Sequence, residues 1–183
     1  MKMRRFEKLL VNRSRHSARV AERAEQLVRL TNPQPGQRLL DVGCGNGAAA
    51  VHLASVFALD VTGIDVDPEQ VDAALAAGSG SAAVRFVVAD ALDLPFSDGE
   101  FDLVHTNKTT HHIPDWRQAL AEMTRVLKPA GFLVYTDFVA PLGDRLPTRR
   151  ALGDFAVEQH LETTYRAGSL VRATAIFRKP AGG

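Results

Sequence analysis

Hydrophobic and polar positions follow two different spacings along the chain. Five short apolar runs, rich in β-branched residues, occur at 38–42, 59–64, 84–88, 101–105 and 132–138. Helical spacing lies between the first three runs, and again between the fourth and the fifth. Strands that alternate with helices are typical of right-handed βαβ units, whose helices cover both faces of a parallel sheet. The pattern predicts an α/β fold with a doubly wound, mostly parallel sheet.

The two ends of the chain depart from this alternation. Helical spacing over 4–12 and 14–30 predicts two amino-terminal helices, the second with a buried face formed by Val20, Leu27 and Val28. At the other end, the runs 161–166 and 170–178 flank a turn, which predicts an antiparallel β-hairpin.

Capping signals mark where two of the central helices begin. Asp67 stands before Pro68 and three residues before Gln70, and Asp115 stands three residues before Gln118. The sequence contains no internal repeat or linker. We therefore expect one domain over 1–183, divided into amino-terminal helices (1–31), a core (36–138) and a carboxyl-terminal helix with the hairpin (149–180).

Composition places the chain among globular proteins. It is 45% hydrophobic and 23% charged with a net charge of +1, and no apolar run approaches the roughly 20 residues that span a membrane. Its single cysteine, Cys44, cannot form a disulfide within the chain. We expect a cytoplasmic protein with no nucleic-acid partner.

The charge is nevertheless unevenly distributed. The first 30 residues carry nine Lys or Arg against three Glu. One interpretation is a lid that brings residues of this segment to a ligand, and the other is a weak contact with a membrane surface. The residues available to a lid are Phe6, Asn12, Arg13, Arg15 and His16.

The first apolar run leads directly into a glycine-rich loop, RLLDVGCGNGAAA. Gly43, Gly45 and Ala48 fit the dinucleotide-binding pattern G-x-G-x-x-G/A, and Asp65 follows Gly45 by twenty residues, where a ribose-binding acid is expected. The same loop also fits the pattern acid-x-Gly-x-Gly-x-Gly, which begins at Asp41. The loop alone therefore leaves two kinds of ligand open.

The charge of Asp41 separates the two. A dinucleotide brings a doubly negative diphosphate to this turn, and a carboxylate there would repel it. S-adenosylmethionine has no phosphate, and it carries an ammonium, a carboxylate and a positive sulfonium. Asp41 can stabilise the cationic end, while free N–H groups of the loop are expected to receive the carboxylate. The charge argument favours S-adenosylmethionine as the cofactor, with S-adenosylhomocysteine as its product.

Four motifs occur in order: LLDVGCGNG, VTGIDVDPEQV, FVVADALDLPFSDGEFDLV and HHIPDWRQALAEMTRVLKPAG. Over 36–138 the sequence resembles the class I S-adenosylmethionine-dependent methyltransferases of type 11, the small-molecule branch that includes ubiquinone and menaquinone biosynthesis enzymes. The resemblance implies in-line transfer of a methyl group to a small-molecule acceptor. It also implies a Rossmann-like sheet of seven strands with amino-terminal lid helices.

The resemblance assigns roles to individual residues. Asp65 would hold both ribose hydroxyls, Asp90 would accept from the adenine amino group, and Ala91 would offer its backbone N–H. Thr106 and Asn107 would contact the methionyl end. Singly, each acid has a structural explanation, but acids at three successive strand ends line one crevice. The full predicted cofactor set is Asp41, Gly43, Gly45, Asn46, Gly47, Asp65, Val66, Asp90, Ala91, Thr106 and Asn107.

Candidate catalytic residues follow the fourth apolar run, in HTNKTTHHIPD. His111 and His112 are candidate general bases, because imidazole takes up a proton near neutral pH. The alternative is that the pair packs under the loop or bonds to backbone. Polar residues precede the histidines, where the family commonly has apolar ones. Lys108 alone does not indicate an acidic substrate.

Other enzyme classes lack their signatures in this sequence. No Asn-Pro-Pro-aromatic tetrapeptide follows the fourth run, no Tyr-x-x-x-Lys pair is present, and no His, Asp or Glu group has metal-ligand spacing. Two alternatives remain open: an inactive regulatory module that binds S-adenosylmethionine, and a nicotinamide-dependent oxidoreductase. The acceptor and the oligomeric state are not predicted.

Overall fold

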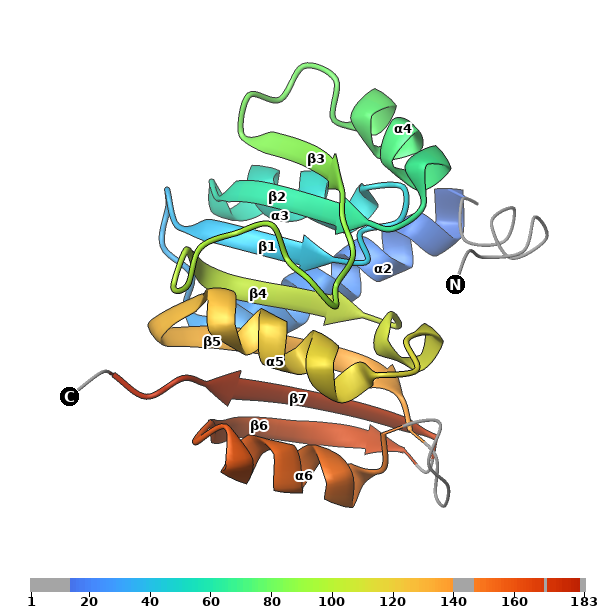
Figure 1. The fold of residues 1–183 in the computed structure, drawn as a ribbon. Coiled ribbons are helices and arrows are strands. Elements are labelled where there is room, and N and C mark those ends of the chain that lie inside the picture. The colour runs from blue at the N-terminus through green and yellow to red at the C-terminus, as the bar shows by residue number, and fades with distance from the viewer. Residues whose placement is uncertain (1–13, 140–146, 170, 182–183) are drawn as a thin grey trace. The chain divides into compact units, whose positions relative to one another are not determined.

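The computed structural model describes residues 14–139, 147–169 and 171–181. The chain divides into two compact units, Met1–Asp90 and Ala91–Gly183, which are drawn in Figure 1. Each unit is an α/β arrangement with its own group of paired strands, and each is described separately.

The first unit is a parallel sheet with helices attached to it. Its strands follow the order β3-β2-β1, and all the pairings within it are parallel. α2 contacts α3, α3 contacts β2, and α4 contacts β3. The elements are α2 (Ser14–Val28), η1 (Arg29–Thr31), β1 (Arg38–Val42), α3 (Ala48–Phe57), β2 (Asp60–Asp65), α4 (Pro68–Ala77) and β3 (Val84–Val88).

Apolar residues of the inner strands form the core of this unit. Leu39 and Leu40 of β1 and Val61 of β2 are fully buried, which is why these segments are continuous apolar runs without alternation. The predicted buried face of α2 is confirmed at Leu27 and Val28, whereas Val20 is half-buried. The expected helix over 4–12 lies outside the described residues.

The second unit combines parallel and antiparallel pairing. Its strands follow the order β4-β5-β7-β6, in which β4 and β5 are parallel and the other two pairings are antiparallel. The predicted hairpin is formed by β6 and β7, seen in red tones in Figure 1. The elements are β4 (Phe101–Asn107), η2 (Thr110–His112), α5 (Trp116–Val126), β5 (Leu127–Phe138), α6 (Arg149–Glu158), β6 (Glu162–Ser169) and β7 (Arg172–Arg178).

The strand prediction is confirmed with one informative shift. β5 begins at Leu127, earlier than the expected residue 132, because Leu127 already pairs with Phe101. Ala130 then adopts a left-handed backbone with φ of 63°, and the register shifts between Phe101 and Leu103. The α/β class with parallel strands and a terminal antiparallel hairpin is confirmed, and the division of 1–183 as one domain stays a prediction.

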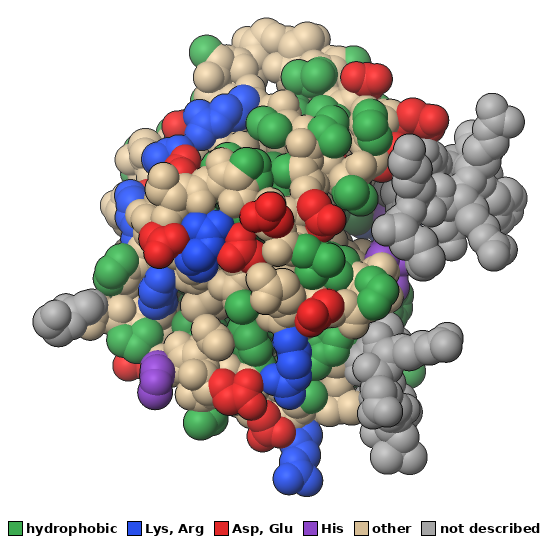
Figure 2. Space-filling model, in the orientation of Figure 1, with side chains coloured by type: hydrophobic (Ala, Val, Ile, Leu, Met, Phe, Trp, Pro, Cys, Tyr) green, Lys and Arg blue, Asp and Glu red, His purple; other side chains and the backbone are tan. Residues whose placement is uncertain are grey.

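Both predicted helix caps are formed. The Asp67 side chain accepts from Glu69 N at 3.1 Å, and the Asp115 side chain accepts from Gln118 N at 3.1 Å. No helix among the described residues has the length and apolar character needed to cross a membrane. Basic and acidic side chains are interspersed over the face shown in Figure 2, as expected for a chain of low net charge.

Candidate functional site

The glycine loop between β1 and α3 needs glycine at three positions. Gly43, Gly45 and Gly47 have positive φ angles of 74°, 52° and 76°, a region that side chains disfavour. At Gly47 a Cβ would also stand 2.6 Å from Phe86 Cζ, so a side chain there cannot be accommodated without displacing the ring. The backbone angle therefore favours glycine at all three positions, and close packing adds a second requirement at Gly47.

Most of the N–H groups of this loop are already bonded within the protein. The N–H groups of Gly43 and Cys44 both donate to the Ile64 carbonyl at 2.9 Å. Gly47 N donates to the Cys44 carbonyl at 3.0 Å, and Gly45 N donates to Asp65 Oδ2 at 3.0 Å. The expectation that the loop offers free N–H groups is therefore wrong at these four positions, because the end of β2 supplies three of the acceptors and the Cys44 carbonyl supplies the fourth.

Carboxylates surround the loop in the first unit. Asp41, at the end of β1, is 2% exposed. Burial raises the pKa of Asp65, and the like charges of Asp67 and Asp41 add to the rise, while the N–H groups of Asp67 and Gly45 oppose it. These shifts indicate that Asp41 and Asp65 lie within electrostatic reach of one another, so a positive charge at the loop would be stabilised.

Cys44 lies between these acids but is not a reactive group. Burial raises the pKa of its thiol, and the charges of Asp41 and Asp65 raise it further. A thiol in such surroundings stays protonated at neutral pH and is a poor nucleophile.

The remaining predicted residues of the first unit lie beside the loop or after a strand. Asn46 donates from Nδ2 to Ser17 Oγ of α2 at 2.9 Å. Val66 follows Asp65 and is 46% exposed. Asp90 is exposed and lies two residues after β3. Ala89, between β3 and Asp90, donates its N–H to the Asp65 carbonyl of β2 at 3.1 Å.

The structure adds a residue that the sequence analysis used only as a capping signal. Gln70 is 1% exposed, and its Oε1 has no hydrogen-bond partner among the residues described. This atom lies 3.8 Å from the position of a Cβ built on Gly45. A buried, unsatisfied amide beside the loop is costly without a ligand or water to bond to it.

Three predicted cofactor residues belong to the second unit. Ala91 is its first residue and is buried. Thr106, 1% exposed, pairs with Tyr135 of β5, and Asn107 ends β4 opposite Thr136. Thr106 and Asn107 lie at the carboxyl end of β4, where ligands of open parallel sheets bind.

The two candidate histidines differ in their surroundings. His111 Nδ1 lies 2.6 Å from Asp137 Oδ1, and its backbone N–H donates to Asp137 Oδ2 at 3.1 Å. The two imidazole rings stack with centroids 3.8 Å apart. Because Asp137 accepts a hydrogen bond at Nδ1, the proton of neutral His111 is assigned to Nδ1. Nε2 then has the free lone pair and can accept a proton.

A buried network holds the carboxylate of this pair. Thr110 Oγ1 donates to Asp137 Oδ2 at 2.7 Å and is 2.9 Å from Tyr135 Oη. Burial alone would raise the pKa of Asp137, but the hydrogen bond from His111 and the charge that His111 carries when protonated, together with the Thr110 and Phe138 bonds, lower it overall. Asp137 therefore stays ionised and can orient His111.

Sequence reasoning missed Asp137, and it considered Thr110 only as one of the polar residues before the histidines. The available signal was an acid at the end of the apolar run 132–138, since a charge in that position on a buried strand requires a partner. The partner comes from a turn 26 residues earlier in the chain, which spacing alone does not identify.

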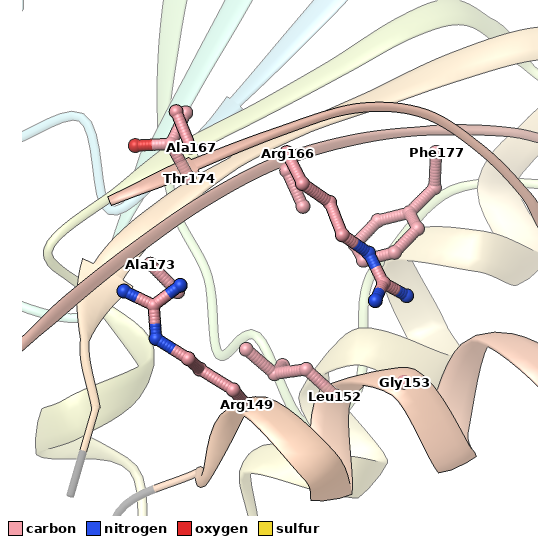
Figure 3. A pocket seen from close by; sticks show the side chains of 9 residues that line it. Arg149, Leu152, Gly153, Arg166, Ala167, Ala173, Thr174 and Phe177 are labelled. Carbon is pink, nitrogen blue, oxygen red and sulfur yellow. The ribbon is translucent and has the colours of Figure 1, made fainter. Parts of the chain in front are cut away.

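The second unit also contains a pocket of about 110 Å³ between α6 and the β6–β7 hairpin (Figure 3). Leu152 and Phe177 contribute apolar walls, and Arg149 and Arg166 lie along its sides. The Arg149 guanidinium donates to the Ser169 carbonyl and, at 2.9 Å, to the Arg172 carbonyl. None of the predicted site residues lines this pocket.

A metal centre is not indicated by the part of the chain that the structure describes. Within residues 14–139, 147–169 and 171–181, no group of three or more His, Cys, Asp or Glu is arranged to hold an ion.

Comparison with known proteins identifies the family. A family model described as a methyltransferase domain matches residues 40–135, more than half of the chain. The protein belongs to this methyltransferase domain family. The matched residues contain the glycine loop, β2, β3, β4 and most of β5.

Similar proteins extend this assignment. An O-methyltransferase of Penicillium expansum is 40% identical over 120 residues, which is 62% of this chain and 42% of that protein. The chain spans less than half the length of the first curated relatives that it matches.

Two solved structures share the fold. One is an S-adenosylmethionine-dependent methyltransferase from Aquifex aeolicus, with a TM-score of 0.79 and 18% identity over 97% of this chain and 99% of that one. The other is a 4+2 cyclase, with a TM-score of 0.79 and 24% identity over 88% of this chain and 81% of that one. A fold shared by a methyltransferase and a cyclase does not by itself decide the reaction.

Proposed function

We propose that the protein transfers a methyl group from S-adenosylmethionine to an oxygen of a small-molecule acceptor. Membership of the methyltransferase domain family supports the reaction. The similarity to the Penicillium expansum O-methyltransferase supports oxygen as the acceptor atom.

The observation that carries the cofactor assignment is the internal bonding of the glycine loop. A diphosphate is held by free backbone N–H groups, whereas this loop has committed four of them to carbonyls and to Asp65. The loop is also flanked by buried Asp41. A site with few free donors and nearby carboxylates favours a cationic ligand over a nicotinamide dinucleotide.

Gln70 supports the same ligand class. Its buried Oε1 is an acceptor without a partner beside Gly45. S-adenosylmethionine offers N–H and O–H donors, and a ligand with donors would satisfy this atom. The residues of the first unit therefore fit the cofactor.

We assign the cofactor contacts by position. In the first unit, Asp41 and the loop residues would lie at the methionyl part, Asp65 would bind the ribose hydroxyls, and Val66 and Asp90 would lie at the adenine. In the second unit, Ala91, Thr106 and Asn107 remain predicted contacts. The loop residues are Gly43, Gly45, Asn46 and Gly47.

The residues of the second unit provide proton transfer. When bound, S-adenosylmethionine supplies a methyl group that its sulfonium already activates for displacement. His111 is oriented by Asp137, so that Nε2 can take the proton of an acceptor hydroxyl. This pair favours an active enzyme over an inactive regulatory module, because a binding module has no need of an oriented base.

The amino-terminal segment has a proposed role in cofactor binding. Asn46 of the loop bonds to Ser17 of α2 at 2.9 Å. This bond supports a role beside the cofactor over a role at a membrane surface. Phe6, Asn12 and Arg13 lie outside the described residues, as does the side chain of Arg15.

The proposal is tested by ligand binding followed by turnover. S-adenosylhomocysteine should raise the melting temperature, whereas NAD should not. In calorimetry, Asp65→Asn should weaken S-adenosylhomocysteine binding about tenfold or more, because the variant loses a pair of charge-assisted hydrogen bonds to the ligand. Asp60→Asn is the matched control, because Asp60 lies at the opposite end of β2 in a long 3.9 Å contact with exposed Arg85.

Turnover is then measured with a labelled methyl donor and a panel of phenols and alcohols. Stabilisation by NAD alone would reject the cofactor assignment. Binding without transfer to any acceptor would favour the regulatory module.

A further inference from the structure

A cluster of two cations and an aromatic ring lies beside the proposed base, within the second unit. Lys108 Nζ is 5.8 Å from the centroid of the Phe138 ring, and the Arg172 guanidinium carbon is 5.5 Å from the same centroid. His111 meets this ring edge to face at 5.0 Å. Lys108 follows β4, Phe138 ends β5 and Arg172 begins β7, so three chain segments converge here.

The backbone holds both cations in place. Lys108 has a left-handed φ of 56°, which a non-glycine residue adopts at a cost, and its N–H donates to the Thr136 carbonyl at 2.7 Å. Arg172 pairs with Phe138 in the antiparallel register, and its carbonyl accepts from Arg149 at 2.9 Å. Within the part of the chain that the structure describes, neither cation is placed by an ion pair.

Neither cation of the cluster forms an ion pair with a carboxylate of the described residues. Among the described residues, neither the Lys108 ammonium nor the Arg172 guanidinium has an ion pair or a side-chain hydrogen bond. Asp137 lies nearby, but its two oxygens are engaged by His111, Thr110 and the Phe138 N–H. Burial lowers the pKa of Lys108, and the charge of Arg172 lowers it further, against the attraction of Asp137.

A simpler explanation is that Arg172 merely covers an aromatic ring. The same strands contain the matched case: Phe132 pairs with Arg178, whose guanidinium carbon is 5.7 Å from the ring centroid. Among the described residues, neither a second cation nor a histidine lies against the ring of that pair. The addition of Lys108 brings two like charges together, and such an arrangement becomes favourable when an anion binds between them.

We propose that Lys108, Arg172 and Phe138 bind an anionic group, a carboxylate or a phosphate, on an aromatic methyl acceptor. This inference rests on the proposed function where it identifies the ligand as a methyl acceptor. The anion site itself is argued from the cluster alone. The ring of Phe138 packs against the acceptor, the cations hold its anionic group, and His111 lies within reach of its hydroxyl. Arginine and lysine together suit carboxylate and phosphate oxygens.

The first experiment measures binding without turnover. Benzoate and phenyl phosphate are titrated against the protein by saturation-transfer NMR, with benzamide as the neutral analogue. We expect both anions to bind at least tenfold more tightly than benzamide, and Arg172→Gln or Lys108→Gln to remove most of that preference. Arg178→Gln, the matched pair at the other end of the strands, should leave it unchanged. The preference should also fall as ionic strength rises.

The second experiment measures methyl transfer to 4-hydroxybenzoate and to 4-hydroxybenzamide. We expect Arg172→Gln to raise KM for the acid about tenfold while kcat and the amide kinetics change less than twofold. Equal binding of benzoate and benzamide, or equal effects of Arg172→Gln and Arg178→Gln, would overturn the anion site even if methyl transfer occurs. Anion binding that Arg172→Gln abolishes would support the site even if no acceptor is methylated.

Discussion

The two ends of the β5–β7 ladder contain the same pair of residue types in very different surroundings. At one end Phe132 pairs with Arg178, and at the other Phe138 pairs with Arg172. The ring-to-guanidinium distances are 5.7 and 5.5 Å, so the pairs are alike as local packing. What differs is the bonding of the charged groups around each pair.

At the Phe132 end, the neighbouring lysines are bonded to protein oxygens. Lys128 Nζ is 2.9 Å from both carboxylate oxygens of Asp102. Lys179 Nζ donates to the carbonyls of Thr124 and Leu127 at 2.9 and 2.7 Å, which satisfies carbonyls at the end of α5. This end of the ladder uses its charges for stability.

At the Phe138 end lie the two cations of the proposed anion site. Lys108 and Arg172 have no carboxylate partner among the described residues, and Asp137 is committed to orienting His111. The carboxyl ends of parallel strands are where open α/β sheets bind ligands, and functional sites retain charge arrangements that stability alone would not select. The contrast indicates that the Phe138 end serves chemistry and the Phe132 end serves folding.

The largest expected effect is on kcat, and it compares Asp137 at the Phe138 end with Asp102 at the Phe132 end. Asp137→Asn should lower kcat for methyl transfer by about 100-fold or more, because His111 loses the carboxylate that fixes its tautomer. Asp102→Asn, which breaks the partly exposed pair with Lys128, should change kcat less than twofold. Labelled-methyl turnover measured across pH gives kcat for both variants. At acidic pH, the dependence of kcat on pH should differ between Asp137→Asn and the wild type. Equal losses in the two variants would remove the distinction between the ends.

A smaller effect is expected from the buried threonines. Thr110→Val should cost about 1–3 kcal/mol of unfolding free energy, since it leaves Asp137 and Tyr135 each without a buried bond. Thr124→Val should cost under about 1 kcal/mol, because its hydroxyl donates only to the Leu120 carbonyl within its own helix. Urea denaturation of both variants measures the difference. A Thr124→Val variant as unstable as Thr110→Val would contradict the assignment of the stronger network to the Phe138 end.

The smallest effect concerns acid stability. The folded-state pKa of Asp137 is lowered, so its contribution is fully present above the unfolded value of about 4 and is lost as pH falls through the lower folded value. Wild-type protein should therefore lose stability below pH 4 more steeply than Asp137→Asn. Parallel curves of unfolding free energy against pH for the two proteins would show that His111 does not stabilise the ionised carboxylate.

Local sequence signals predicted most of the fold. The apolar runs gave the bounds of β1 and β3 directly, because each is a continuous buried or edge strand closed by glycine or a turn. The start of β5 was missed, since the segment Leu127 to Gly131 contains a proline, a left-handed Ala130 and the turn that ends α5. Pairing of Leu127 with Phe101 is a tertiary contact that spacing does not reveal.

The site was predicted less completely. Acids at strand ends marked the cofactor loop, yet three of its four bonded N–H groups donate to Ile64 and Asp65, on another strand. Arg172 joins Lys108 only through the antiparallel register of β7 against β5, 64 positions later in the chain. Residue type and local spacing carry no information on such a register.

Cys44 gives the molecule an internal reporter of loop opening. It is the only thiol in the chain, and burial among acidic groups keeps it protonated and shielded from alkylating reagents. Its modification then proceeds through transient exposure of the segment around it, at a rate governed by that local opening. Any ligand that closes over the glycine turn should slow the labelling, and no dye or engineered probe is needed to follow it.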